Sequence, residues 1–365
     1  MALLFASKSN KKIYAISVPQ SWASPTGPTW VYLLEDQGVT MIDSGGAGSF
    51  AYLTLGLERI RFSLKDIDRV IVTHGHWDHD GLAAELTKRT NAEVWTHDIY
   101  SYLAPYAPRE LLRSEDSEFQ RQIDEILEND SQNGRFVSPF YRKNGYTPLF
   151  KEYFDDKQTL KVAKRITDGD TDGGLTFTHT PGHSPDHLCI SFEGLVFTGD
   201  HILPEITPHP TMKVRYPDQV RAKLPQVYRQ ESDYWGLLVY LKSLKKMSYQ
   251  NSGDQPVLPA HRLFNKGKLN LTTIDRAHEI IEHHEQRLSK IVRKIGDSPT
   301  RLEDVTRNIF SRRKLIGGNL YPAFREVVSH IELLIESGDL ERDEAGKLRW
   351  KGTENFRQVI AELRP

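Results

Sequence analysis

The first third of the chain alternates between the hydrophobic periods of strands and helices. Short apolar runs bounded by turn residues predict strands at residues 12–19, 29–36 and 38–46. Residues 49–60 instead space their apolar positions as a helix does.

The alternation continues at residues 68–98. An apolar run at 68–76 predicts a buried strand that ends in a histidine-rich segment, residues 80–90 predict a helix, and residues 92–98 predict another strand. Strand-like runs return later, at residues 175–184, 187–203 and 256–262, with a helix at 231–248. This order predicts an α/β fold built in layers.

Residues 105–160 interrupt this order. They contain four prolines, an amphipathic stretch at 117–129 and several aromatic residues. A long insert between β-rich halves is often functional, so we expect a lid or a substrate wall. The alternative is a surface decoration with no role at the site.

The chain changes character near residue 272. Helical patterns at 273–295, 301–310 and 323–338 precede a predicted β-hairpin at 339–350, which turns at Ala345 and Gly346. Three helices followed by a hairpin is a winged-helix pattern. The sequence therefore predicts a first domain at 1–272, carrying the insert, and a winged-helix-like domain at 273–365.

Composition places the chain among ordinary globular proteins. Hydrophobic residues make up 38% and charged residues 27% of its 365 residues, and the formal net charge is −1. The single cysteine, Cys189, excludes an internal disulfide framework. No apolar run reaches the roughly 20 residues of a membrane span, and residues 1–12 do not resemble a secretory signal. We therefore expect a cytoplasmic protein that needs no membrane.

Metal-binding side chains gather where four predicted strands end. The stretch HGHWDH begins at the end of the strand predicted at 68–76, and the other ligand candidates lie near the ends of the later strand-like runs. The set is His74, His76, Asp78, His79, His183, Asp200 and His261. Loops at the carboxyl ends of strands are the usual place for sites in α/β proteins.

The number and type of these residues predict a centre for two metal ions. Histidine and aspartate suit zinc, iron or manganese. Structural zinc sites are closed, four-coordinate and mostly rich in cysteine, whereas this set contains no cysteine and exceeds the needs of one tetrahedral ion. Five histidines and two carboxylates can hold two ions that share one carboxylate.

The motifs HGHWDH, TPGHS, FTGDH and PAH, in that order, strongly resemble those of the metallo-β-lactamase fold superfamily, over about residues 12–265. The resemblance implies an αββα sandwich. It also implies that His74, His76 and His183 hold the first metal, that Asp78, His79 and His261 hold the second, and that Asp200 bridges them. Asp43 would lie beneath the metals as a supporting residue.

Within that superfamily, the site argues against a true β-lactamase, because those enzymes typically have a cysteine where this chain has Asp200. The set looks more like glyoxalase II, lactonases and the RNA-processing members. His76 excludes the flavodiiron pattern, which has a glutamate there. The C-terminal pattern is similar to the winged-helix tail of a subgroup that includes mammalian β-lactamase-like protein 2, an endoribonuclease.

Two metal ions, most readily Zn²⁺ with Fe or Mn as alternatives, could lower the pKa of a shared water to about 7. The resulting bridging hydroxide would attack a thioester, ester or lactone carbonyl of a small-molecule acyl substrate. Asp78 would orient this nucleophile and take its proton.

Cleavage of single-stranded RNA is the main alternative function. A winged helix suggests nucleic acid, but residues 273–365 carry 17 Lys and Arg against 16 Asp and Glu, and only residues 311–314 form a basic cluster. A mononuclear-iron persulfide dioxygenase is a weaker alternative. A homodimer is one assembly that the sequence allows.

The remaining candidates receive supporting roles. We expect His187 beneath the site or in the core, His97 and His201 in structural positions, and Trp77 in packing. We also expect His209 and Tyr216 to line the substrate pocket, and His283 and His284 to face the solvent or the domain interface.

Overall fold

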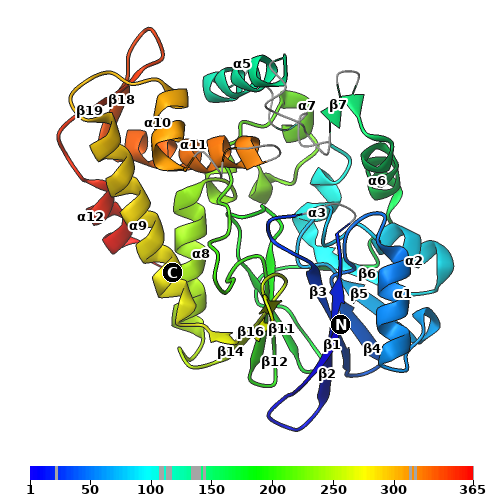
Figure 1. Cartoon of the computed structure of the whole chain (residues 1–365). Helices are drawn as coiled ribbons and strands as arrows, with labels where there is room; N and C mark the ends of the chain where they lie inside the picture. Colours follow the sequence, from blue (N-terminus) through cyan, green and yellow to red (C-terminus); the bar gives the residue numbers. More distant parts are fainter. Residues whose placement is uncertain are drawn as a thin grey trace.

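Two β-sheets lie face to face at the centre of the molecule, with helices on both outer sides (Figure 1). The structure is a computed structural model that describes residues 1–20, 24–106, 111, 117–132, 141–142, 145–311, 315 and 319–364. The layers follow the order helix, sheet, sheet, helix. This agrees with the predicted α/β sandwich.

The first sheet combines an antiparallel meander with a parallel half. Within the described residues its strands, in spatial order, are β1 (Ala2–Ala6), β2 (Lys12–Val18), β3 (Thr29–Glu35), β4 (Val39–Ile42), β5 (Arg69–Ile71), β6 (Glu93–His97) and β9 (Lys164–Ile166). Strands β4, β5, β6 and β9 are parallel to one another. Their carboxyl ends therefore meet at one edge of the sheet.

Both faces of this sheet are covered. Successive residues of β3 point to opposite faces. Val31 and Leu33 pack with the cluster under helices α1 (Phe50–Arg59) and α2 (Ala83–Arg89), whereas Trp30 and Tyr32 pack in the layer between the sheets. This double burial explains why the strand reads as an unbroken apolar run.

The second sheet supplies the other half of the central layer. Its described strands, in spatial order, are β10 (Thr171–Asp172), β11 (Leu175–His179), β12 (Leu188–Phe192), β13 (Leu195–Gly199), β14 (Pro256–Pro259) and β17 (Thr272–Thr273). Phe177 and Phe197 pack with Tyr32 of the first sheet. Strands β13 and β14 are parallel, so both end beside the same edge.

Helices cover the outer face of the second sheet and continue into the C-terminal region. They are α8 (Leu237–Gln250), α9 (Arg276–Ile295), α10 (Leu302–Ile309), α11 (Leu320–Glu336) and α12 (Phe356–Glu362), with the hairpin β18 (Leu340–Arg342) and β19 (Leu348–Trp350). The predicted order of three helices and a hairpin is present. The winged-helix identity of this region and the boundary at residue 272 stay predictions.

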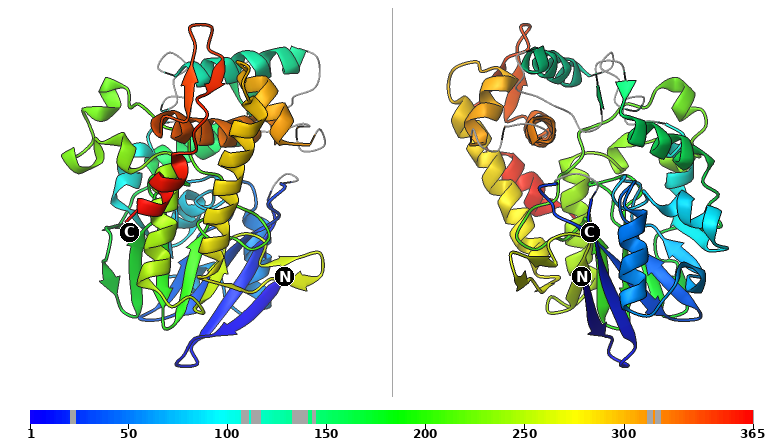
Figure 2. Two further views of the ribbon diagram at one scale, coloured as in Figure 1. Left: turned by 90° about the vertical axis from the view of Figure 1, so that its left-hand side faces the viewer. Right: turned by 45° about the vertical axis from the view of Figure 1, so that its right-hand side comes forward.

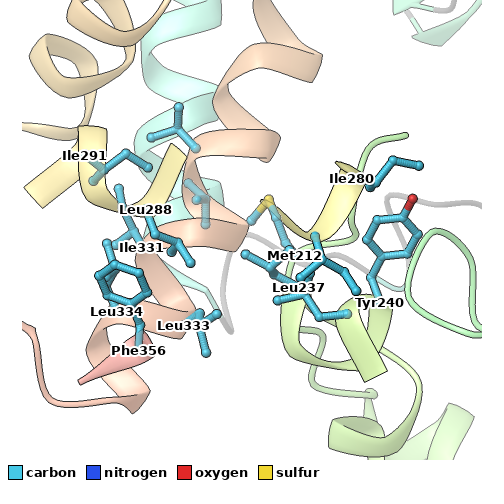
Figure 3. Packing of buried hydrophobic residues seen from close by; sticks show 14 of the residues in the cluster. Met212, Leu237, Tyr240, Ile280, Leu288, Ile291, Ile331, Leu333, Leu334 and Phe356 are labelled. Atoms are coloured by element: carbon cyan, nitrogen blue, oxygen red, sulfur yellow. The ribbon is translucent and has the colours of Figure 1, made fainter. Parts of the chain in front are cut away.

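One apolar cluster joins these helices to the second sheet. Figure 3 shows part of it, where side chains of α8, α9, α11 and α12 meet. The cluster extends to Val196 of β13 and Val257 of β14. The C-terminal helices therefore share a core with the sheet that carries part of the candidate site.

The insert at 105–160 docks its two long helices at different places. Helix α5 (Glu118–Gln132), which covers all but the first residue of the predicted amphipathic stretch, lies beside α11, while α6 (Pro148–Thr159) lies against α2 (Figure 2). The short strands β7 (Tyr141–Arg142) and β8 (Gly145–Tyr146) pair between them. Residues 312–314 of the predicted basic cluster lie outside the described residues.

Short elements complete the description. They are α3 (Asp98–Leu103), α7 (Asp218–Arg221), the hairpin β15 (Phe264–Asn265) and β16 (Lys268–Leu269), and 3₁₀ turns at Leu64–Asp66, Gln226–Tyr228 and Glu231–Asp233. In the described part of the chain, no helix combines the length and apolarity that a bilayer crossing requires.

Leu288 tests the shared C-terminal core, since it is fully buried on α9. We expect Leu288→Ala to lower the free energy of unfolding by about 2–5 kcal/mol, because it leaves a cavity among aliphatic side chains. Glu282→Ala, at an exposed position of the same helix, should change it by less than about 0.5 kcal/mol. Urea denaturation measures both. Equal effects of the two substitutions would contradict the packing described.

Candidate metal centre

The structure brings all seven predicted ligands together at the edge where β5, β11, β13 and β14 end. Their side chains form three overlapping groups whose ligand atoms lie within 4.8 Å of one another. The first group is His74, His76 and His183, the second is Asp78, His79 and His261, and a third, His74, His79 and Asp200, overlaps both. All seven residues are buried or partly buried.

Three imidazoles converge in the first group. His76 Nδ1 lies 2.9 Å from His74 Nε2 and 3.1 Å from His183 Nε2. Burial lowers the pKa values of all three histidines, and the neighbouring imidazoles lower that of His74 further. These rings are therefore neutral at neutral pH, which is the form that binds a metal.

Asp200 lies between this group and the second one. Its Oδ2 is 3.6 Å from His183 Nε2, whereas its Oδ1 is 3.6 Å from His79 Nε2 and 3.5 Å from His261 Nε2. Asp78 closes the second group, with its Oδ2 3.3 Å from His261 Nε2. One carboxylate thus faces both sets of imidazoles.

The second group has the opposite electrostatic balance. Burial alone would lower the pKa of His79, but the carboxylates of Asp43, Asp200 and Asp78 outweigh it and raise that pKa well above its usual range. The pKa of His261 is raised in the same way, by Asp200 and Asp78 against burial. Burial would raise the pKa of Asp200, but His261 and His79 hold it well below its usual value.

Hydrogen bonds to the far ring nitrogens orient four of the histidines. His183 Nδ1 donates to the His209 carbonyl at 2.7 Å, and His261 Nδ1 donates to the Pro28 carbonyl at 3.0 Å. His79 Nδ1 donates to Asp43 at 2.8 Å, and His74 Nδ1 lies 3.1 Å from Thr73 Oγ1. These contacts fix the tautomer and leave Nε2 for a metal.

Asp43 supports the ligand loop, the role that the family resemblance implied for it. It follows β4 with a left-handed backbone (φ 59°) and is 1% exposed. Its carboxylate accepts hydrogen bonds from the backbone N–H and hydroxyl of Thr73, at 2.7 and 2.9 Å, as well as from His79. Because Thr73 donates to this side chain and not to a neighbouring strand, β5 ends earlier than the apolar run at 68–76 suggested.

Two glycines allow the ligand loops to pack closely. A Cβ at Gly199 would lie 2.8 Å from Thr73 Oγ1 and 2.9 Å from His187 Nε2, and a Cβ at Gly182 would lie 2.4 Å from the backbone of Tyr240. Both glycines also have a positive φ. They precede Asp200 and His183 directly, so close packing places these two side chains.

Buried atoms without partners show that the residues fit a metal ion. Among the described residues, His79 Nε2, His261 Nε2 and Asp200 Oδ1 are buried and have no hydrogen-bond partner. An unpartnered buried polar atom is costly. Three such atoms that face one another are what a bound cation would satisfy.

Several supporting residues escaped the sequence analysis. Gln20 Nε2 donates to Asp78 Oδ2 at 3.0 Å, and Asp186 Oδ2 accepts the Gly75 N–H at 2.7 Å. Asp80 accepts from two tyrosines and from Lys157 of the insert. Gln20 and Asp186 do not stand out by their spacing along the chain, and only the fold brings the partners of Asp80 to it.

The other candidates lie mostly beneath the site. His187 is fully buried, and its Nε2 accepts the Asp200 N–H at 3.2 Å, which agrees with the expected supporting role. His97 accepts from the Ile99 N–H at the start of α3 and stacks on His179, while His201 packs edge-on against Tyr240.

Five further candidates lie at the site, in the core or partly at the surface. His209 contributes its carbonyl to His183, whereas Tyr216 lies in a separate buried cluster and accepts a hydrogen bond from Trp235. His284 is buried between α8, α9 and α11, against Tyr240 and His330, and its neighbour His283 is partly exposed. Trp77 packs against Phe150 of the insert, as expected.

Comparison with known proteins places this geometry in a family. A sequence profile described as the metallo-beta-lactamase superfamily matches residues 24–230, more than half of the chain. The chain belongs to the metallo-beta-lactamase superfamily. The buried histidine and aspartate groups are consistent with a metal site typical of this superfamily.

Three known proteins are similar to this chain over most of its length. The probable metallo-hydrolase YqjP of Bacillus subtilis (strain 168) is 23% identical over 353 residues, which cover 93% of this chain and 95% of that protein. The metallo-beta-lactamase family protein TTHA1429 from Thermus thermophilus has a TM-score of 0.63 at 19% identity, covering 93% of this chain and 98% of that one. A beta-lactamase domain protein from Burkholderia ambifaria also gives 0.63, at 22% identity, covering 95% and 92%.

Asp43→Asn tests the support beneath the site. The amide presents one oxygen in place of two and carries no charge, so His79 loses its charged acceptor. We expect metal affinity to fall by about 10- to 100-fold. Competition with a chromophoric chelator measures this, and circular dichroism checks that the variant is folded. Unchanged affinity in a folded variant would show that Asp43 does not orient His79.

Metal binding should release protons. The raised pKa values of His79 and His261 mean that these rings hold protons which a metal must displace, so affinity should fall as the pH is lowered through those pKa values. Calorimetry in buffers of different ionisation enthalpy counts the protons. His261→Asn should release fewer protons than the wild type. Binding without proton release would contradict the assigned charges.

Proposed function

We propose that the protein is a dinuclear metal-dependent hydrolase that cleaves a thioester, ester or lactone of a small-molecule substrate. The observation that carries this proposal is the position of Asp200, whose two oxygens face different groups of imidazoles. A carboxylate in this position suits a bridge between two ions. The name of YqjP, a probable metallo-hydrolase, supports the same reaction class.

The donor set favours zinc, with iron or manganese as alternatives. His74, His76 and His183 would hold one ion, Asp78, His79 and His261 the other, and Asp200 would contact both. When bound, such ions supply a Lewis acid and lower the pKa of water at the site to about 7.

Asp78 is the candidate proton acceptor. Burial would raise its pKa, but His79 and His261 hold it below the usual value, so its carboxylate is ionised at neutral pH. Gln20 donates to Oδ2 and thereby restrains the side chain. An ionised, restrained carboxylate can orient a water molecule and accept its proton.

The insert favours a small substrate over a nucleic acid. Phe150 of α6 packs on Trp77 of the metal loop, with ring centroids 5.9 Å apart, so the insert borders the ligand loop. Near-neutral charge in the C-terminal region gives little attraction for a phosphate backbone. We therefore expect an acyl substrate that is enclosed between the insert and the sheet edge.

Metal analysis followed by turnover tests the proposal. We expect two equivalents of metal, and hydrolysis of at least one member of a panel of acyl-CoA and glutathione thioesters, esters and lactones. Asp78→Ala should lower kcat by about 10²- to 10⁴-fold, since it removes the proton acceptor. Glu282→Ala on α9 serves as the matched control and should retain full turnover.

Other results would contradict the proposed function or the role of Asp78. Cleavage of single-stranded RNA without any ester or thioester turnover would make the protein a nuclease. One equivalent of iron with oxygen uptake would instead indicate a dioxygenase. Full activity of a folded Asp78→Ala variant would remove Asp78 from the mechanism.

A further inference from the structure

Asp80, which follows the candidate ligand His79, is held by the insert. Its side chain is 1% exposed and accepts hydrogen bonds from Tyr100 at 2.9 Å and from Tyr153 at 2.7 Å. The Lys157 ammonium lies 2.9 Å from Oδ2 of the same carboxylate. Tyr153 and Lys157 are four residues apart on α6, so one face of this helix supplies both groups.

Lys157 also reaches the backbone of the metal loop. Its Nζ donates to the carbonyl of Gly75, the residue between His74 and His76. The Gly75 N–H on the other side donates to Asp186. A Cβ at Gly75 would lie 2.9 Å from Lys157 Nζ and 2.9 Å from Tyr100, so the loop fits closely against these two side chains.

The surroundings of Lys157 distinguish this contact from a surface ion pair. The Lys157 side chain is only 11% exposed, and the rings of Tyr100 and Tyr153 lie 5.1 and 5.5 Å from its ammonium. Burying a charge is costly unless it is paired and hydrogen-bonded. Here the ammonium is satisfied by the Asp80 carboxylate and the Gly75 carbonyl, and by the hydroxyl of Tyr153 on the same helix.

A second ion pair joins α6 to α2 without touching the metal loop. Lys88 on α2 lies 2.6 Å from Asp156 on α6, and their side chains are 59% and 30% exposed. Exposed pairs of this kind contribute about 0–1 kcal/mol. The Lys88–Asp156 pair is therefore a matched control, since it attaches the insert to α2 without contacting the metal loop.

We propose that Lys157 is a positioning residue for the metal centre. From α6 of the insert, it fixes the peptide between His74 and His76 and neutralises the carboxylate next to His79. The insert thus helps to build the ligand loop, besides bordering it. This inference rests on the proposed function, because it requires that the site binds metal ions.

Three variants test the inference, each measured for zinc affinity by chelator competition and for the visible spectrum of the Co²⁺-substituted protein. Lys157→Met should weaken zinc binding by about 10- to 100-fold and alter the Co²⁺ spectrum, because the loop loses its tether. Lys88→Met should leave both unchanged. The double variant Lys157→Met/Asp80→Asn should be more thermally stable than Lys157→Met, since it no longer has a buried carboxylate without a counter-ion. Its zinc affinity should stay low.

The outcomes separate positioning from simple anchoring. Wild-type zinc affinity and Co²⁺ spectrum in Lys157→Met would overturn the inference, as would an equal loss in Lys88→Met. Recovery of zinc affinity together with stability in the double variant would also overturn it, because stability alone would then explain the loss. A wild-type protein that binds no zinc or cobalt would instead refute the proposed function.

Discussion

The buried carboxylate of Asp43 connects the fold to the candidate metal centre. It directly follows β4, accepts two hydrogen bonds from Thr73, which lies just beyond β5, and accepts one from the His79 imidazole. A buried carboxylate without donors would cost several kcal/mol. These contacts therefore fix the position of β4 relative to the ligand loop, and the rest of the site is built around that loop.

The remaining ligands reach the same point because of sheet geometry. Strands β4, β5, β6 and β9 are parallel in one sheet, and β13 and β14 are parallel in the other. The aromatic and aliphatic layer between the sheets holds their ends together. Neutral imidazoles on one side of Asp200 and carboxylate-flanked imidazoles on the other then give the centre two chemically different halves.

The outer parts of the chain are not independent of this centre. The carbonyl of His209 orients His183, and the His209 ring lies 4.0 Å from Glu326 of α11, which pairs with Arg287 of α9. On the opposite side, α6 of the insert contacts the loop through Lys157. Elements that are distant in sequence thus contact two different parts of the metal centre, His183 and the loop around Gly75.

The sequence by itself determined the layered α/β class, the order of helices and hairpin at the C-terminal end, and the seven ligand candidates. The hydrophobic period predicts the type of each element. The HGHWDH stretch with His183, Asp200 and His261 can be identified as candidate ligands because histidine and aspartate side chains bind metal ions. Asp43 was also named, through its family resemblance. Only the tertiary structure decided how these groups combine, because pairing depends on contacts between strands that are far apart in the chain.

The supporting residues show the limit most clearly. Asp80 reads as the start of a helix, Lys157 as one charged residue within the insert, and Gln20 as the residue that follows a predicted strand. Their roles come from three-dimensional neighbours: a carboxylate that needs donors, a carbonyl between two histidines, and the oxygen of Asp78. A polar side chain in sequence has many partners available to it, and only packing selects one.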